Sequence, residues 1–449
     1  MGCTLSRTQD ENGTEPHQLQ VADIFVFVPG LRIPKRIGAA KFLEGRNSGT
    51  LSERLKMRTR ILFLLIKFVF PKEKERRNFT DHGGPSLTEL RLALEEYLSI
   101  LQEFLREGFH LSDIAEFSWS NQEDEIKETT LRSAHYELLS VLHLLGMLFL
   151  IEANIALTPK PSADGSQSKI FEESKKAAIE LLLKAAQVLE CCLSSVLPQF
   201  PAELKAKLPV DLQEAVLRAL QLQALGQGVE IQLGLAIDNV KATLAVKRRL
   251  ACEGVKYWNQ TQESMSKVRL GSDWGKKHAL FVNWKCTEAK AAAYYYHGLI
   301  LDEGLEENTR AEAVACLREA DVLLKESQKN GLQFCAAPPM TRLPIVWGPM
   351  VHLSEKIPKD FSSKVRVNRD AYCRERIPEG LPDLPDFPLA LKAEPYELPP
   401  IDDAWTQEVN HKFSPSVLSH LSIKRDIKQD GQAKRQSRSF NSDKPLTKF

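Results

Sequence analysis

The sequence has almost no net charge. Its 449 residues include 60 Lys and Arg against 59 Asp and Glu, which gives a net charge of +1. This balance excludes a whole-molecule attraction to nucleic acid, so we expect no nucleic-acid partner. The eight cysteines include no C-x-x-C pair and follow no cleavable apolar signal, so they are expected to be reduced thiols in the cytosol.

The sequence also lacks a long hydrophobic run. The best candidate spans residues 138–151, is interrupted by Ser140 and His143, and is closed by Glu137 and Glu152. A membrane span needs about 20 apolar residues. We therefore expect this segment to be a buried core helix.

Catalytic motifs are missing as well. Between Gly271 and Gly275 there are three residues where a phosphate-binding loop has four, and Lys277 stands where that loop has Ser or Thr. The sequence has no H-E-x-x-H, G-x-S-x-G or G-x-G-x-x-G motif. We therefore expect no enzyme, and no catalytic residue, cofactor or metal site. An unrecognised helical enzyme stays open as an alternative, and it would require a polar pocket around Glu288, Tyr294 and His297.

Helical periodicity dominates what is present. Apolar residues recur at i, i+3, i+4 and i+7 and predict helices over residues 86–107, 126–157, 170–197, 210–239, 240–265, 282–303 and 309–328. Capping boxes at Ser86 with Glu89 and at Thr309 with Glu312 mark two of the helix starts. The only strong strand signal is VADIFVFV at residues 21–28, which predicts one strand or extended segment.

The C-terminal third changes in character. Small residues between 285 and 328 predict a close helix pair that resembles one tetratricopeptide-like hairpin. Prolines break the forty residues after Gly331, and seven more between 378 and 400 predict an extended strap. Residues 424–449 have a net charge of +5 and little apolar content, so this tail is expected to be disordered.

The N-terminus carries a specific signal. The opening MGCTLS fits the N-myristoylation pattern at Gly2, and Cys3 is placed for S-palmitoylation. Two acyl chains hold a protein on a membrane, whereas one gives marginal binding. Residues 32–60 have a net charge of +7, which either faces anionic lipid or forms a solvated surface.

Three motifs in order resemble the Bro domain family of endosomal-sorting adaptors, which includes Alix, rhophilin and Brox. They are EFSW at 116–119 followed by Tyr136-Glu137, the helix pair KAAAY at 290–294 with EAVACLREA at 312–320, and NRDAY at 368–372 followed by Pro378 and Leu381-Pro382. The resemblance implies an all-α, boomerang-shaped, tetratricopeptide-like helical domain without catalytic activity. With the extended N-terminal segment and the Pro-rich C-terminal strap, this domain is expected to span residues 21–402, between a flexible acylated N-terminus at 1–20 and a basic tail at 403–449.

The resemblance also implies a partner, the C-terminal amphipathic helix of an ESCRT-III subunit lying in an apolar groove. Matching the family pattern places the groove contacts at Leu233, Val246 and Leu250, although a gap leaves Gln232 as an alternative to Leu233, and all three also fit an ordinary core. The coiled region that follows this domain in Alix and the prenylation cysteine of Brox-like members are expected to be absent.

These observations favour a lipid-anchored adaptor on the cytosolic face of the endosomal or plasma membrane, with a cytoplasmic pool. The alternative is a general tetratricopeptide-like membrane scaffold for a signalling or trafficking partner unrelated to ESCRT-III.

Overall fold

The computed structural model describes residues 24–35, 49–69, 84–105, 116–159, 172–271, 273–304, 307–341, 347–371 and 380–399. The chain divides into two units, Met1–Leu398 and Pro399–Phe449, and the following description concerns the first. Gly2, Cys3 and the basic tail lie outside the described residues. The predicted domain limits at residues 20 and 402 lie outside them too and stay predictions.

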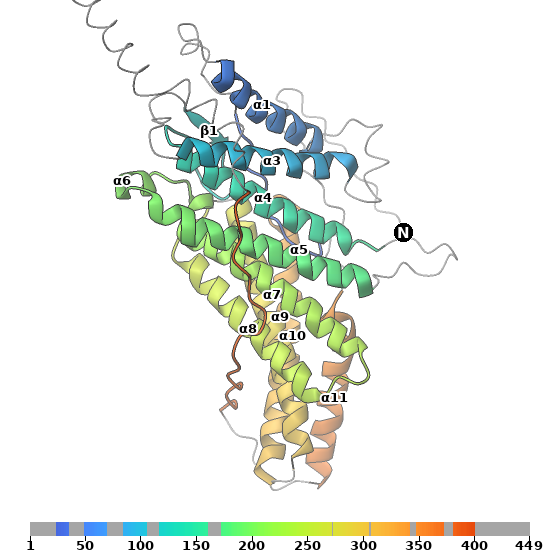
Figure 1. Cartoon of the computed structure of the whole chain (residues 1–449). Coiled ribbons are helices and arrows are strands. Elements are labelled where there is room, and N and C mark those ends of the chain that lie inside the picture. Colours follow the sequence, from blue (N-terminus) through green and yellow to red (C-terminus); the bar gives the residue numbers. More distant parts are fainter. Residues whose placement is uncertain are drawn as a thin grey trace, which may run out of the picture. The chain divides into compact units, whose positions relative to one another are not determined.

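The described part is almost entirely helical, which confirms the all-α prediction (Figure 1). Its main helices are α1 (Gly49–Val69), α3 (Gly84–Leu105), α4 (Ala134–Ala156), α5 (Glu172–Cys191), α7 (Glu214–Asp238), α8 (Leu244–Ser266), α9 (Trp274–Glu303), α10 (Glu307–Ala336) and α11 (Pro349–Ala371). The short α6 (Ala202–Lys205) lies between α5 and α7. Consecutive long helices pack side by side, with α1 on α3, α3 on α4, α4 on α5, α5 on α7, α7 on α8, α8 on α9 and α9 on α10.

A small antiparallel hairpin precedes α4, and the sequence analysis missed it. Strand β1 (Phe117–Ser120) pairs with β2 (Glu128–Leu131), with Phe117 opposite Leu131 and Ser120 opposite Glu128. The helix predicted from residue 126 therefore begins only at Ala134, where the Ser133 side chain accepts a hydrogen bond from the Tyr136 backbone N–H. Strands of four residues are too short to show a clear alternating pattern.

Helix α4 lies in the core, as predicted for residues 138–151. By length and composition, Ala134–Ala156 and Glu172–Gln199 are the two helices in the described part that could cross a membrane, and 89% and 56% of their apolar windows are buried inside the protein. Burial on all sides explains why α4 has no polar face. The length and apolar composition of α4 are therefore explained by its position in the core.

The predicted N-terminal segment is non-helical over residues 24–28, where it forms no strand and bends at Phe25 and Val26. The Asn154 side-chain oxygen accepts hydrogen bonds from the backbone N–H groups of Phe25 and Val26 at 2.7 and 2.8 Å. The Gln223 amide donates to the Phe27 carbonyl at 2.9 Å, so the segment is held by α4 and α7 at once. Buried side-chain amides supply the partners that these backbone groups lack in the absence of a sheet or helix.

The predicted close helix pair is formed by α9 and α10. A Cβ atom on Gly298 would lie 3.1 Å from the Ala313 carbonyl and from the side chains of Cys316 and Leu317. Only glycine permits this approach of the two backbones.

Helix boundaries differ from several predictions. The capping residues predicted at Ser86 and Thr309 lie two residues inside α3 and α10, and α9 starts eight residues earlier than predicted, at Trp274. The prolines after Gly331 do not keep that region irregular, because Pro349 opens α11 and Pro358 lies inside it. Proline suits the first helical turn, where its missing N–H would have no helical partner.

The predicted strap is extended over residues 380–399 and crosses α8, α7 and α5 (Figure 1). Its backbone is held by side chains of α8. One Glu253 oxygen accepts hydrogen bonds from the N–H groups of Ala390 and Leu391, at 2.7 and 2.9 Å, and the Tyr257 hydroxyl donates to the Leu391 carbonyl. A Cβ on Gly228 would approach the Leu391 side chain to 2.8 Å, so glycine leaves room for the strap on α7.

Candidate binding groove

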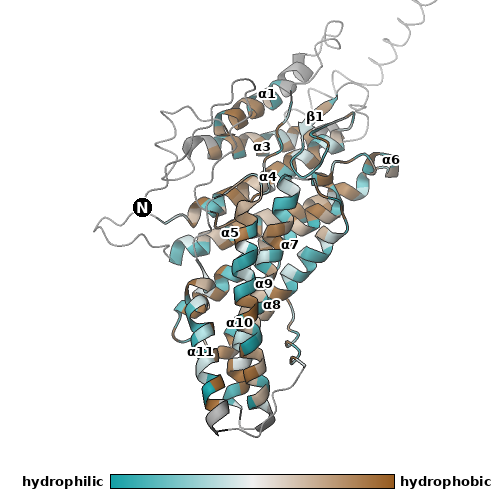
Figure 2. Cartoon of the chain, turned by 180° about the vertical axis from the view of Figure 1, so that it is seen from behind, coloured by the Kyte–Doolittle hydropathy of each residue, from teal (hydrophilic) through white to brown (hydrophobic). Residues whose placement is uncertain are grey.

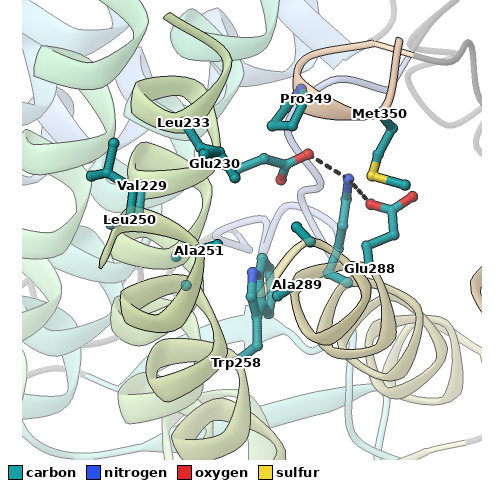
Figure 3. A pocket seen from close by; sticks show the side chains of 14 residues that line it. Val229, Glu230, Leu233, Leu250, Ala251, Trp258, Glu288, Ala289, Pro349 and Met350 are labelled. Atoms are coloured by element: carbon teal, nitrogen blue, oxygen red, sulfur yellow. Dashed lines mark hydrogen bonds and ion pairs between the residues drawn. The ribbon is translucent and has the colours of Figure 1, made fainter. Parts of the chain in front are cut away.

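The predicted groove residues Leu233 and Leu250 line one cleft between α7, α8, α9 and the start of α11 (Figure 3). The cleft has a cavity volume of about 30 Å³, which is room for one or two water molecules. Its lining is mostly apolar and includes Val229, Ala251, Ala289, Ala292 and Met350. A space of this size suits single side chains of a partner and is far below the usual size of a small-molecule site.

The three predicted groove residues differ in exposure. Leu233 is 5% exposed, Leu250 is half-buried, and Val246 is 46% exposed, one helical turn before Leu250 on α8. Gln232, the alternative to Leu233, does not line the cleft, and neither does Val246, which lies on the exposed surface of α8. Leu233 and Leu250 therefore form the floor of an apolar step whose outer edge is Val246. We call these three residues the α7–α8 step.

An ion cluster borders the step. The Lys285 Nζ lies 2.8 Å from both Glu230 Oε1 and Glu288 Oε2, and the Lys285 side chain is almost fully buried (Figure 3). Burial opposes the charge of Lys285, but the two carboxylates outweigh it and raise its pKa. Burial raises the pKa of Glu230, against the opposing effect of Lys285. The second Glu230 oxygen has no hydrogen-bond partner among the described residues.

The exposed rim beside the step is basic. Lys247, Arg248 and Arg249 follow Val246 directly, and no acidic residue occurs in α8 before Glu253. Arg248 lies over the Phe387 ring of the strap, whereas Arg249 is exposed to solvent. An apolar step beside cations favours an amphipathic partner with acidic residues next to its apolar face.

The residues of the alternative polar pocket are not gathered at one point. Glu288 pairs with Lys285, and the His297 ring lies 3.5 Å from Arg248. Glu288 and His297 are nine residues apart on α9, which separates them by roughly 13 Å along the helix axis. Among the described residues no group of three His, Cys, Asp or Glu side chains is placed to hold a metal ion.

The basic segment at residues 32–60 is in part structural. Arg32 donates hydrogen bonds to Ser140 Oγ at 2.9 Å and to the Tyr136 hydroxyl at 3.0 Å, and it is fully buried. Arg58 is 3% exposed and forms an ion pair with Glu137 at 2.6 Å. These two buried charges fit neither alternative given for the segment, because they face neither lipid nor solvent.

The described cysteines are free thiols, as predicted. All six are buried: Cys191, Cys192, Cys252, Cys286, Cys316 and Cys335. Burial raises the pKa of Cys252 to about 11 and that of Cys316 to about 12. Thiols with raised pKa values are poor nucleophiles and metal ligands, so these cysteines serve as packing residues.

The described helices thus form an array with an apolar step on its surface and buried ion pairs within. The sequence matches the profile of the BRO1-like domain over residues 73–393, and the chain belongs to this family. No curated protein matches the sequence.

Solved structures share the fold at low sequence identity. One, described as an ALIX BRO1 CHMP4C complex, is 18% identical with a TM-score of 0.56, and the match covers 84% of this chain and 97% of that one. Another, described as the structural basis for endosomal targeting by the Bro1 domain, is 19% identical with a TM-score of 0.55 and coverages of 85% and 95%.

A third is a crystal structure of ALIX in complex with the SIVmac239 PYKEVTEDL late domain. It is 17% identical with a TM-score of 0.60, and the match covers 91% of this chain and 55% of that one.

Proposed function

We propose that this protein is an adaptor of endosomal sorting that binds the C-terminal amphipathic helix of an ESCRT-III subunit at the α7–α8 step. The observation that carries the proposal is the increase in side-chain exposure from Leu233 through Leu250 to Val246. These apolar residues on adjacent helices offer a buried floor and an exposed edge. Membership of the BRO1-like family and the fold shared with a BRO1 domain described in complex with CHMP4C support it.

The chemistry of the step specifies the ligand. A helix lying along α8 would place apolar side chains spaced three or four residues apart over Leu250 and Val246. Acidic residues flanking that stripe would face Lys247 and Arg249. No catalysis is part of this function, and no cofactor is involved.

Binding to synthetic ESCRT-III C-terminal helices tests the partner. Fluorescence anisotropy with full-length protein is expected to show binding that Val246→Asp weakens about tenfold or more, because a buried unpaired carboxylate replaces an apolar contact. Val240→Asp is the matched control, since Val240 is 99% exposed at the turn before α8. Leu250→Asp should act in the same direction, with circular dichroism reporting that the fold is kept.

If wild-type protein binds none of these helices, or Val246→Asp and Leu250→Asp bind as wild type does, the ESCRT-III proposal fails. A protein that binds no ESCRT-III helix yet stays on the membrane would favour the alternative, a general membrane scaffold for another partner.

We also propose that acyl chains on Gly2 and Cys3 hold the protein on the cytosolic face of the endosomal or plasma membrane, alongside a cytoplasmic pool. The support is the MGCTLS sequence and the rule that two chains are needed for stable attachment. Fractionation and fluorescence in cells are expected to show that Gly2→Ala releases the protein to the cytosol and that Cys3→Ser leaves weak, reversible attachment. Unchanged location of both variants would contradict the acylation proposal.

A further inference from the structure

The outer face of α1 combines exposed apolar and basic side chains. Phe63 is 66% exposed and Ile66 is 44% exposed, although both belong to the apolar half of the helix. Lys56, Arg60 and Lys67 are also exposed, and the series Lys56, Arg60, Phe63, Lys67 advances by four, three and four residues. This spacing places the cations on the same face as Phe63, because residues three and four apart are neighbours on a helix.

The exposure of this face has no explanation within the described fold. The opposite face of α1 is buried through Ile61, Leu64, Leu65 and Phe68, which pack in the main core with residues of α3. Helix α1 lies at one end of the helical array, next to α3 (Figure 1; Figure 2 shows the same end from behind). Single exposed apolar residues are common on proteins, whereas here two lie together among exposed cations.

The charge of the surrounding sequence matches one kind of partner. Residues 54–69 contain no acidic residue, and residues 32–77 contain 14 Lys and Arg against four Glu, a net charge of +10 in a protein whose total is +1. Setting aside the buried Arg32 and Arg58 still leaves +8. Among the described residues, the ion pairs on this face of α1 join Arg60 to Glu89 and Glu96, at 3.8 and 3.3 Å. Lys56 and Lys67 have no acidic partner in that part of the chain.

We propose that the outer face of α1 binds an anionic lipid bilayer, with Phe63 and Ile66 entering the interfacial region and Lys56, Arg60 and Lys67 lying against the headgroups. A basic amphipathic helix binds membranes in this way, by apolar burial together with attraction to anionic lipid. This inference deepens the membrane attachment of the proposed function, and it adds a contact that needs no acyl chain. Acylation and the α1 face then supply two attachment signals on one end of the chain.

Vesicle co-sedimentation with full-length protein made in bacteria, and therefore unacylated, tests the α1 face by itself. We expect binding to phosphatidylcholine vesicles that contain roughly 30% phosphatidylserine, with weak binding to pure phosphatidylcholine. Binding should fall steeply at about 0.5 M salt, because screening shortens the range of the attraction. The double variants Phe63→Gln/Ile66→Gln and Lys56→Glu/Lys67→Glu should each weaken binding about tenfold or more.

Matched controls are Val240→Gln for an exposed apolar residue and Lys207→Glu for an exposed cation, and both should bind like wild type. If unacylated wild-type protein does not prefer anionic vesicles, or if the two α1 variants bind as tightly as the controls, the inference is wrong. Failure of acylation would appear separately, as an unchanged cellular location of Gly2→Ala. Failure of the ESCRT-III proposal would appear only in the peptide assay.

Discussion

At the residue scale, Glu137 connects three parts of the structure. Its carboxylate accepts hydrogen bonds from Arg58 Nε at 2.6 Å, Trp119 Nε1 at 2.6 Å and the Tyr97 hydroxyl at 3.2 Å, and it is fully buried. The family motif in the sequence marked Trp119 and Glu137 but gave no role to Arg58, which lies 79 residues earlier. Local patterns cannot reveal such a pairing, because it depends on how α1 packs beside α3 and α4.

Replacing Glu137 by Gln should destabilise the protein by about 3–5 kcal/mol, because it leaves the buried Arg58 without a counter-charge. The exposed ion pair of Arg132 with Glu116, also at 2.6 Å, offers the control: Glu116→Gln should cost less than about 1 kcal/mol. Urea denaturation measures both changes in the free energy of unfolding. Equal effects of the two substitutions would show that burial of the Arg58 pair is not what matters.

His143 gives a prediction about pH. Burial, and secondarily the charge of Arg32, lowers its pKa to about 3, and neither ring nitrogen has a hydrogen-bond partner among the described residues. The unfolded chain takes up this proton below about pH 6.5, whereas the folded protein does so only near pH 3. The free energy of unfolding therefore falls as the pH drops through this window, by at most about 1.4 kcal/mol per pH unit.

Asp211 acts in the opposite direction, because burial raises its pKa to about 6 and the folded state binds its proton first as the pH falls. The His143→Leu variant keeps Asp211 and loses only the His143 effect. Its free energy of unfolding should consequently decline less than that of wild type between pH 6.5 and 4, as measured by urea denaturation at several pH values. Parallel declines in the two proteins would refute the assignment to His143.

At the element scale, the sequence predicted what periodicity and proline content reveal. The long helices, the non-helical segment around Phe25 and the strap were predicted because their patterns are local. The β1–β2 hairpin was missed, and α11 was predicted to be broken although Pro349 starts it and Pro358 lies within it. In both regions tertiary contacts decide the structure. The hairpin forms backbone hydrogen bonds with the segment at Ile33 and Lys35. Helix α11 buries Leu353 and Ile357 against residues of α8, α9 and α10.

Among the α8 side chains that hold the strap, Glu253 accepts two backbone hydrogen bonds. Glu253→Ala should remove both hydrogen bonds to the N–H groups of Ala390 and Leu391 and make local opening of the strap about tenfold or more easier. Hydrogen exchange at residues 389–392 measures this opening, with Glu263→Ala on the exposed side of α8 as the control. Unchanged exchange in Glu253→Ala would mean that the other contacts of the strap, the Tyr257 hydrogen bond and the packing of Leu389 and Leu391, hold it without Glu253.

At the scale of the whole molecule, the α7–α8 step and the outer face of α1 belong to separate helices of the array. The sequence placed Leu233 and Leu250 together through a family resemblance, while the exposure of Val246 and the lining by α9 and α11 required the structure. The sequence left open whether the charge of residues 32–60 faces lipid. The exposure of Phe63 and Ile66 beside it became evident only from the packing of α1 on α3, which shows which side of the helix is covered.

The two surfaces should therefore act independently. Val246→Asp should leave binding to anionic vesicles unchanged, and Lys56→Glu/Lys67→Glu should leave peptide affinity unchanged. The combined variant should lose as much peptide affinity as Val246→Asp and as much vesicle binding as Lys56→Glu/Lys67→Glu. Parallel anisotropy and co-sedimentation measurements on the four proteins check this. A loss of peptide affinity in the α1 variant would instead indicate coupling between the surfaces.

The N-terminal segment around Phe25 cannot reach its folded position until much later parts of the chain have been synthesised. Phe25 hydrogen-bonds through its backbone to Asn154, 129 residues later, and to Gln227, 202 residues later. At synthesis rates of roughly 5–20 residues per second, the ribosome adds Gln227 roughly 10–40 s after Phe25. During that interval the nascent chain carries Phe25, Val26 and Phe27 without their partners. Of the described segments, the first to be translated is thus among the last to reach its final position.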